Sequence, residues 1–543
     1  MGCTGVKRGQ ILFNARVPAM RSQALIGLSV FVVGLFIAYQ IGGKIAGGDM
    51  STVEFAAFGF AAIWVGLTIL RNWRLGFYLF LVWILCEDLV RKYLGNNMAI
   101  YFGKDVLVGL VFVSLYVEVR KGRVKLFRPP FLLFLYFFLF LGALEIFNAN
   151  SPHILYGLMG FKLYFYYMPL MFVGYALIRN DDDFRKFLVI NLSLAAIIGV
   201  IGIMQAILGH SFMNPETLAP ELRDLGALDR YTPLTNQLVS IPSSIFVSAG
   251  RYSLYLVLAF VLCVGTAGYL LLHTTKNRKF VFLTLGILVA ATLFCGARGP
   301  VMYIMASTLA LTAALLWGAP WRWQQAHRMI KAIRRVFIVG ALGLAAILLI
   351  FPEEAAPRIA FYMETLDPNS SAFEVGTRTW NYPMSGLVSA MNEPHWLVGN
   401  GIGTASLGGQ YVAKFIGKPQ IPVWVEEGYG QMILEMGFAA PFLWILWTGA
   451  LLVYAWRIVR GLRQTRFFPI AFAIFWYAFL LLYPFTYGGL AAYQNFVDNA
   501  YLWVIVGILF KLPALYAANP SGAPAAPVVA PPPGWGRPQA SRF

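Results

Sequence analysis

The residues best suited to chemistry lie between positions 423 and 437, where the chain reads VWVEEGYGQMILEMG. Two adjacent glutamates, Glu426 and Glu427, precede a helix-like apolar run. Gln431 and Glu435 follow Glu427 at intervals of four residues, so these three side chains share one face of a predicted helix. A carboxylate can accept a proton in general base catalysis. If this helix enters a membrane, its polar stripe is expected to line an internal cleft rather than face lipid.

Basic side chains supply the complementary chemistry. Arg298 in CGARGP lies at a tight turn between glycines, and Arg378 in GTRTW lies in a long loop. Arginine presents a planar fork of donors that fits phosphate and carboxylate oxygens. Lys162 in GFKLYFYYMP and Arg251 in SAGRYSLYL lie near the ends of apolar stretches. Each of these two fits an interfacial cation that extends its charge into water as well as it fits a ligand-binding residue.

A glycine-rich stretch, VGNGIGTAS at positions 398 to 406, resembles a phosphate-cradling loop. It lacks the Lys-Ser/Thr pair of a nucleotide P-loop and does not lie in a βαβ unit, which argues against nucleotide binding. The 5 histidines show no pair spacing for a metal, and the 4 cysteines form no cluster. The sequence therefore predicts neither a metal site nor a disulfide framework.

The composition of the whole chain is that of a membrane protein. Of its 543 residues, 59% are hydrophobic and only 12% are charged, and its mean hydropathy is +0.67. A soluble domain carries roughly 25% charged residues. Repeated apolar stretches of about 20 residues match the helix length needed to cross the hydrocarbon core of a bilayer. The sequence therefore predicts an all-α polytopic membrane protein embedded in a lipid bilayer.

Apolar windows predict about fourteen transmembrane helices. About eleven of these fall in an N-terminal region, residues 1–351, and about three fall in residues 428–515. A large, partly helical periplasmic loop, residues 352–427, separates the two regions, and a disordered Pro/Ala-rich cytoplasmic tail occupies residues 516–543. The predicted spans lie near positions 24–42, 55–70, 75–90, 99–117, 130–147, 161–178, 187–209, 247–272, 280–296, 299–318, 336–351, 428–456, 467–487 and 497–515. The first is expected to be a retained helix, because no small-residue cleavage site follows it.

The distribution of the 42 Lys and Arg residues predicts the sidedness of the loops. Most of them lie in alternate connections, such as VRKGRVKLFR and KNRK, which the positive-inside rule assigns to the cytoplasm. Both termini are then cytoplasmic, and the net charge of +18 reflects topology rather than nucleic-acid binding. The opposite, periplasmic side holds Lys162, Arg251, Arg298, Arg378 and Glu426, which predicts a site at that face.

The region from residue 376 to about 440 resembles the core of the bacterial O-antigen ligase and polymerase superfamily. The segment GTRTWNYPMSGLVSAMNEPHWLVGNGIGTAS is similar to the family's Arg-x-x-x-Trp-like and Gly-x-Gly-x-Gly-like stretches. The segment EEGYGQMILEMG is similar to the His-Asn-x-Tyr-Leu-x-x-Leu-x-Glu-x-Gly-like segment that opens the next helix. Ala297, Arg298 and Gly299 resemble a Ser-Arg-Gly-like motif at a periplasmic turn.

The resemblance implies a glycosyltransferase of the bacterial inner membrane, acting at the periplasmic face without a metal or other cofactor. Its substrate would be a polyprenyl-diphosphate-linked oligosaccharide, and flippase and chain-length regulator proteins would be its partners. Arg298 and Arg378 would bind the diphosphate and stabilise the charge on the leaving group. A general base would activate the acceptor hydroxyl. Glu426 and Glu427 occupy the positions of the family's histidine and asparagine, so either is a candidate base.

Further residues are expected to bind the substrate. Some would contact the diphosphate or the polar part of the cleft, and aromatic rings would stack on sugar faces. These residues are Lys162, Arg251, Trp380, Gly401, Gly403, Tyr429, Gln431 and Glu435.

Three functions remain open. The absence of the family's histidine favours an O-antigen or exopolysaccharide polymerase, because ligases more often keep that residue. A ligase that moves a glycan onto a lipid core or a protein is the nearest alternative. A polysaccharide or lipid transporter is an alternative from another class, and it would place polar residues through the bilayer midplane. The gathering of polar residues at one face argues for surface chemistry instead.

Overall fold

In this computed structural model the chain divides into two compact units, residues 1–72 and residues 73–543. In the first unit the structure describes one long helix, α2 (Met50–Arg71). All other described elements belong to the second unit. The described residues are 50–95, 98–209, 211–215, 229–273, 278–320, 331, 334, 338, 349–406, 408–417 and 425–518.

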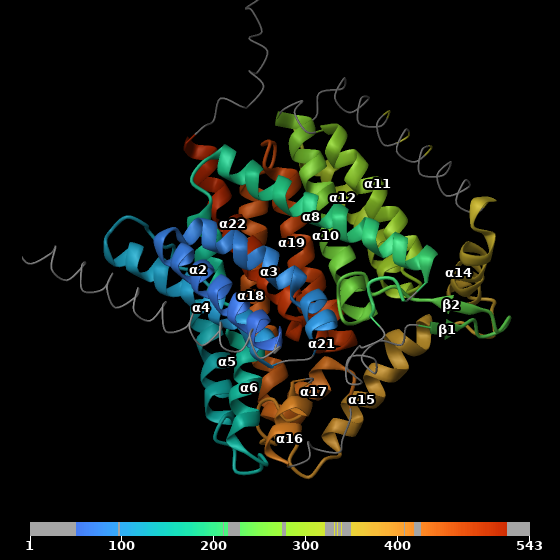
Figure 1. Ribbon diagram of the computed structural model, residues 1–543, viewed down its shortest axis with the longest axis horizontal. Helices are drawn as coiled ribbons and strands as arrows, with labels where there is room; N and C mark the ends of the chain where they lie inside the picture. Colours follow the sequence, from blue (N-terminus) through green and yellow to red (C-terminus); the bar gives the residue numbers. More distant parts are fainter. Residues whose placement is uncertain are drawn as a thin grey trace, which may run out of the picture. The chain divides into compact units, whose positions relative to one another are not determined.

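Helices dominate the second unit, as expected for apolar runs that must satisfy their own backbone hydrogen bonds in a membrane (Figure 1). Two segments, η1 (Thr377–Asn381) and η2 (Leu481–Phe485), are π-helical. The α-helices are α3 (Trp73–Leu94), α4 (Met98–Arg120), α5 (Leu132–Glu145), α6 (Ile154–Phe165), α7 (Leu170–Leu177), α8 (Asp181–Leu208), α10 (Ala249–His273), α11 (Arg278–Phe294), α12 (Arg298–Gly318), α14 (Pro352–Leu366), α15 (Tyr382–Met391), α16 (Gly409–Ile416), α17 (Gly428–Met436), α18 (Ala439–Gly461), α19 (Phe468–Leu480), α20 (Thr486–Gly488), α21 (Ala491–Gln494) and α22 (Phe496–Ala518).

The protein is a multi-pass, membrane-embedded helical protein by the length and composition of these helices. Seven helical segments of the described residues are long and apolar enough to cross a membrane. The predicted count of about fourteen spans is therefore not confirmed. The seven segments are Met98–Arg120, Asp181–Leu208, Ala249–Leu272, Arg298–Gly318, Ala439–Gly461, Phe468–Gly488 and Phe496–Ala518.

Four predicted spans are not found as single described helices, for identifiable reasons. The span 24–42 lies outside the described residues, as does most of 336–351. The span 161–178 is divided between α6 and α7 by a turn that ends at Pro169. The span 428–456 is divided between α17 and α18, because Gly437 adopts a φ of 77° and interrupts the helix. A hydropathy window averages over such breaks and cannot detect them.

The core of the second unit is built around α22, which packs against α7, α18 and α19. The α7–α22 contact is close enough for backbone atoms to touch. A Cβ atom added at Gly507 would lie 1.9 Å from the carbonyl oxygen of Met171, and one added at Gly174 would lie 2.1 Å from that of Val504. Small residues permit this approach between helices whose surfaces are equally apolar.

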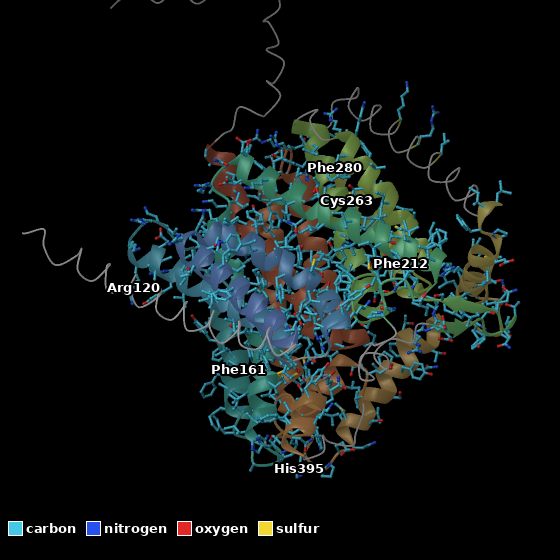
Figure 2. All side chains as sticks on the ribbon, in the orientation of Figure 1. Arg120, Phe161, Phe212, Cys263, Phe280 and His395 are labelled. Atoms are coloured by element: carbon cyan, nitrogen blue, oxygen red, sulfur yellow. The ribbon has the colours of Figure 1, made fainter. Side chains whose placement is uncertain are left out.

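The segment 352–427, which the sequence predicts to be a large loop, contains the described helices α14, η1, α15 and α16. Its first helix is anchored through Arg358, whose buried guanidinium donates to the carbonyl oxygens of Ala206 (3.1 Å) and Ser240 (2.9 Å). Figure 2 shows His395, in this loop, at the opposite end of the second unit from Phe280, which directly follows the basic segment KNRK.

The described residues are mostly helical, as the sequence predicts, and they add one short antiparallel hairpin. Its strands are β1 (Asp229–Tyr231) and β2 (Leu238–Ser240), and Arg230 pairs with Val239. The Glu364 carboxylate accepts hydrogen bonds from the backbone amides of Leu234 (2.7 Å) and Thr235 (3.2 Å) in the hairpin loop. The hairpin is thus fixed to α14.

Candidate active site

Two arginines that lie far apart in the sequence converge on one carboxylate oxygen. Arg298 Nη2 lies 2.6 Å from Glu374 Oε2, and Arg378 Nε lies 3.6 Å from the same oxygen. Arg378 also pairs with Glu426, with 3.4 Å between Nη1 and Oε2. The structure therefore brings together three of the four predicted catalytic residues and adds Glu374, which the sequence analysis did not identify.

The local fold places Arg298 at the N-terminus of a long helix. Gly296 adopts a φ of 63°, so the chain turns sharply, and α12 begins at Arg298 itself. The turn is covered by β2, because a Cβ atom at Gly296 would lie 3.3 Å from side-chain atoms of Val239 and Ile241. The positive end of the helix dipole adds to the guanidinium charge, which favours an anion at this position.

The electrostatics of this group favour a bound anion. The hydrogen bond from Arg298, assisted by the charge of Arg378, holds the pKa of Glu374 below its usual range. Burial, followed by the like charges of Arg298 and Arg378, lowers the pKa of Arg230. Arg230, an exposed residue of β1, is counted with this group because its charge interacts with those of Arg298, Arg378 and Glu374. Three arginines and the two glutamates Glu374 and Glu426 leave an excess of one positive charge, since 3 − 2 = 1.

Several aromatic side chains lie in or beside η1, the segment that carries Arg378. Trp380 is 65% exposed, and the Arg378 guanidinium lies 4.9 Å from the ring centroid of Tyr382. The Tyr487 hydroxyl donates to the carbonyl oxygen of Thr379 at 3.0 Å, and its ring lies 6.4 Å from that of Tyr429. Exposed rings beside an anion site can stack on sugar faces. Arg378 and Trp380 both lie in η1, and π-helical turns frequently occur at functional sites.

The two predicted base residues occupy different environments. Glu426 is 60% exposed. Glu427 is only 3% exposed and is the N-cap of α17, where its carboxylate accepts hydrogen bonds from the backbone amides of Tyr429 and Gly430. Burial raises the pKa of Glu427 to about 7. Of the two, Glu426 is open to a ligand, whereas Glu427 has the basicity suited to neutral pH.

The C-terminal part of the predicted polar stripe, formed by Gln431 and Glu435, does not line an open cleft. Glu435 is fully buried and accepts hydrogen bonds from Ser406 Oγ (2.6 Å), the Ala405 amide (3.1 Å) and the Tyr164 hydroxyl (2.8 Å). Gln431 Nε2 donates to the carbonyl oxygen of Ala405 at 3.1 Å. Because α17 is short and packs against the glycine-rich stretch, its polar face is occupied by that backbone.

The glycines of this stretch are explained by packing. Gly401 and Gly403 adopt φ values of 98° and 88°, which favour glycine. A Cβ atom at Gly403 would lie 2.2 Å from the carbonyl oxygen of Tyr156, and one at Gly160 would lie 2.3 Å from the Gly403 amide nitrogen. The stretch therefore lies directly against α6, and this differs from the open cradle that the glycine pattern predicted.

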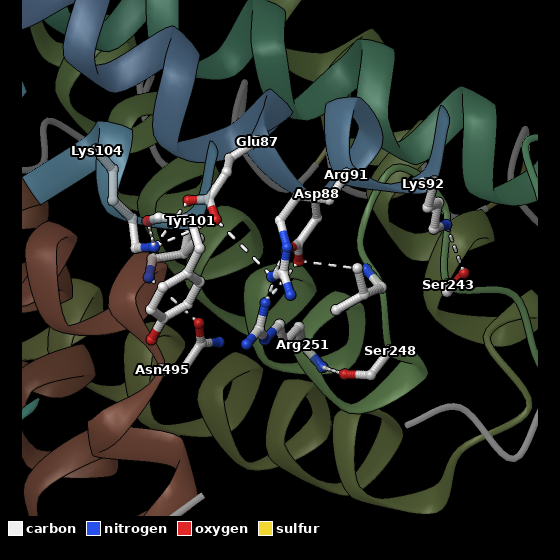
Figure 3. Close-up of polar contacts among 12 residues, drawn as sticks. Glu87, Asp88, Arg91, Lys92, Tyr101, Lys104, Ser243, Ser248, Arg251 and Asn495 are labelled. Atoms are coloured by element: carbon white, nitrogen blue, oxygen red, sulfur yellow. Dashed lines mark hydrogen bonds and ion pairs between the residues drawn. The ribbon is translucent and has the colours of Figure 1, made fainter. Parts of the chain in front are cut away.

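Lys162 and Arg251 belong to a second group, the buried charge network. Figure 3 shows the part of this network around Asp88 and Arg251. Lys162 Nζ lies 2.5 Å from Asp105 Oδ2, and Arg251 Nη1 lies 2.8 Å from both carboxylate oxygens of Asp88. Most other members are fully buried. We define the network by its charged residues, which are Glu87, Asp88, Arg91, Lys92, Lys104, Asp105, Lys162 and Arg251.

The network joins several parts of the second unit. Lys104 of α4 pairs with Glu87 of α3 at 3.0 Å. The Lys92 ammonium donates to Ser243 Oγ at 3.0 Å in the segment that leads from β2 to α10. Arg91 Nη2 donates to the Tyr411 hydroxyl of α16 at 3.3 Å. The segment 229–251 therefore connects the two groups, since Arg230 belongs to the arginine group and Arg251 to the network.

Sequence reasoning missed six of the eight network residues. A usable signal was present in ILCEDLVRKYL, where acidic and basic residues recur at intervals of three and four across the end of the predicted span 75–90. Such spacing places the charges on one helix face. Within the described residues, no group of three or more His, Cys, Asp or Glu side chains is placed to hold a metal ion.

Comparison of the chain with protein-family models, with curated proteins and with solved structures gives no match. The fold and site define the class of the protein as a polytopic helical membrane protein with an exposed arginine group and a buried charge network.

Proposed function

We propose that the chain is a membrane glycosyltransferase that polymerises polyprenyl-diphosphate-linked oligosaccharide repeat units, as an O-antigen or exopolysaccharide polymerase does. The observation that carries the proposal is the convergence of Arg298 and Arg378 on one oxygen of Glu374. Two guanidinium groups that share one oxyanion form the arrangement that recognises phosphate oxygens. The excess positive charge and the adjacent exposed rings suit a diphosphate joined to a sugar.

The proposed reaction needs an anion site and a base. The acceptor hydroxyl oxygen attacks the anomeric carbon of the donor sugar, and the bond from that carbon to the diphosphate oxygen breaks. Arg298 and Arg378 stabilise the charge that develops on the departing diphosphate. The hydroxyl proton passes to a carboxylate, for which Glu426 and Glu427 are the candidates. In this proposal the enzyme lies in the bacterial inner membrane with both termini in the cytoplasm and its site in the periplasm.

The test is the length distribution of glycan on polyprenyl diphosphate in cells that contain or lack the protein. We expect that loss of the protein, or the change Arg298→Ala or Arg378→Ala, removes long chains and lets single lipid-linked repeat units accumulate. Arg123→Ala is the matched control, because Arg123 pairs only weakly at the surface with Glu118 (3.2 Å). Long lipid-linked chains that persist without reaching a final acceptor would contradict the polymerase and support a ligase.

The buried charge network favours one second candidate, a transporter or flippase. Ionisable residues in candidate spans, here Lys104 of α4 and Arg251 of α10, often mark substrate pathways. Both residues lie in the first two turns of their helices, however, so the network does not extend along the spans. Transport would be supported if, after loss of the protein, accumulating repeat units stayed inaccessible to a lectin added at the periplasmic side.

A further inference from the structure

We infer that Glu374 is a built-in competitor of the diphosphate. Its carboxylate lies between Arg298 and Arg378, at the position proposed for the diphosphate, and it must turn away before a diphosphate binds. This inference rests on the function proposed above for the two arginines. It assigns to Glu374 a role in specificity and in product release, beyond an ordinary surface ion pair.

The arginines are incompletely satisfied by Glu374. Both of them reach the same carboxylate oxygen, so the contact is not the bidentate pairing in which each guanidinium nitrogen finds its own oxygen. Arg298 Nη1 is buried and has no hydrogen-bond partner among the described residues. A buried guanidinium nitrogen without an acceptor is costly. A diphosphate carries several oxygens on two phosphorus atoms and could satisfy this nitrogen and Arg378 together.

Glu374 is held more loosely than three other carboxylates of this region, those of Glu364, Glu427 and Glu435. Its carboxylate contacts, within the described residues, are the two arginines, and its side chain is 38% exposed. By contrast, Glu364, Glu427 and Glu435 each accept hydrogen bonds from backbone amides. Glu374 lies in the irregular segment between α14 and η1. A change of its side-chain rotamer can therefore release the arginines without breaking a helix.

A carboxylate in this position selects for ligand charge. Glu374 carries one negative charge, because Arg298 and Arg378 hold its pKa below the usual range. A ligand with one negative charge gains little by replacing it. A diphosphate carries more charge and more oxygens, so its gain exceeds the loss of the Glu374 contacts. After the transfer step, the return of Glu374 to the arginines helps to expel the diphosphate product.

The test is the binding of inorganic pyrophosphate to the purified full-length protein in lipid nanodiscs, measured by calorimetry. We expect Glu374→Gln to bind pyrophosphate about threefold to tenfold more tightly than the wild type, the scale of losing one or two partly exposed ion pairs. Polyprenyl diphosphate in the nanodiscs, in a parallel titration, shows whether the lipid-linked ligand behaves as the free anion does. In chain extension assays, both KM and kcat of Glu374→Gln should fall, because binding tightens and product release slows.

Controls separate this inference from the proposed function. Glu118→Gln, another carboxylate that contacts two cations, should leave pyrophosphate affinity unchanged. Arg298→Ala and Arg378→Ala should weaken it. If the arginine variants lose binding while Glu374→Gln binds as the wild type or more weakly, the inference fails and the anion site stands. If neither the wild type nor Glu374→Gln binds pyrophosphate, the inference about Glu374 and the proposed function of the arginines both fail. Glu374→Ala and thermal unfolding show whether a change in affinity reflects altered folding.

Discussion

At the scale of single residues, Glu426 and Glu427 show how strongly position determines chemistry. Glu426 lies at the surface beside Arg378, whereas Glu427 is enclosed and caps α17. Burial raises the pKa of Glu427 to about 7, even though two backbone amides stabilise its ionised form. A carboxyl group with this pKa changes its charge within the physiological range, as a histidine does.

A pH profile tests whether Glu427 is the base. A base must be ionised, so the rate of chain extension by the wild type should rise as the pH increases through about 7 and level off above it. Glu427→Gln should lose about 10²-fold to 10⁴-fold in rate, the usual contribution of a general base. Glu426→Gln serves as the comparison. A Glu427→Gln variant that keeps both the rate and the profile of the wild type would eliminate Glu427 as the base.

At the scale of elements, the sequence predicted most helices and few of their interruptions. The window 99–117 corresponds to α4 (Met98–Arg120), because a long apolar run with little glycine or proline has one stable form in a membrane. The break at Gly437 was not predicted, since it depends on one positive φ value and on contact with Leu397. The sequence predicted the chemistry of Arg298 and Arg378, but their meeting at Glu374 is a tertiary contact that hydropathy and spacing do not encode.

The α7–α22 contact gives a prediction at this scale. Gly507→Ala should destabilise the protein by about 1 to 3 kcal/mol or more, because the new methyl group would overlap the carbonyl oxygen of Met171. Gly286→Ala in α11 is the matched control, since a Cβ atom there meets nothing within 4 Å. That change should be neutral or slightly stabilising. Thermal unfolding of both variants measures the difference, and equal unfolding midpoints would contradict the close backbone contact.

At the scale of the whole second unit, the buried charge network couples the helices to the large loop. It contains five cations and three carboxylates, so with every group ionised it has an excess of two positive charges, since 5 − 3 = 2. Buried charges are tolerated only when they are paired and hydrogen-bonded. Asp88 is the central carboxylate, because Arg91, Arg251 and the Val247 amide all donate to it.

Removing this carboxylate should destabilise the whole unit. Asp88→Asn leaves Arg251 without its counter-ion, and the expected loss is about 3 to 5 kcal/mol of unfolding free energy. The double variant Asp88→Asn with Arg251→Gln should be more stable than the sum of the single changes predicts. Asp182→Asn, whose carboxylate is exposed and 3.9 Å from Arg185, should have little effect. Additive losses in the double variant would show that Asp88 and Arg251 do not interact.

The π-helical segment η1 contains more residues per turn than the α-helix α15 that follows it. Deleting one residue from η1, such as Thr379, would allow an uninterrupted α-helix and would rotate the preceding residues by about 100° relative to α15. Glu374 and Arg378 both precede Thr379, so they would turn together and lose their positions opposite Arg298 and Glu426, although every charged side chain remained present. The number of residues in η1, and not only their types, thus determines whether the two arginines can act on the same ligand. A change in chain length at η1 is therefore a route by which a related sequence could lose the site while retaining all of its charged residues.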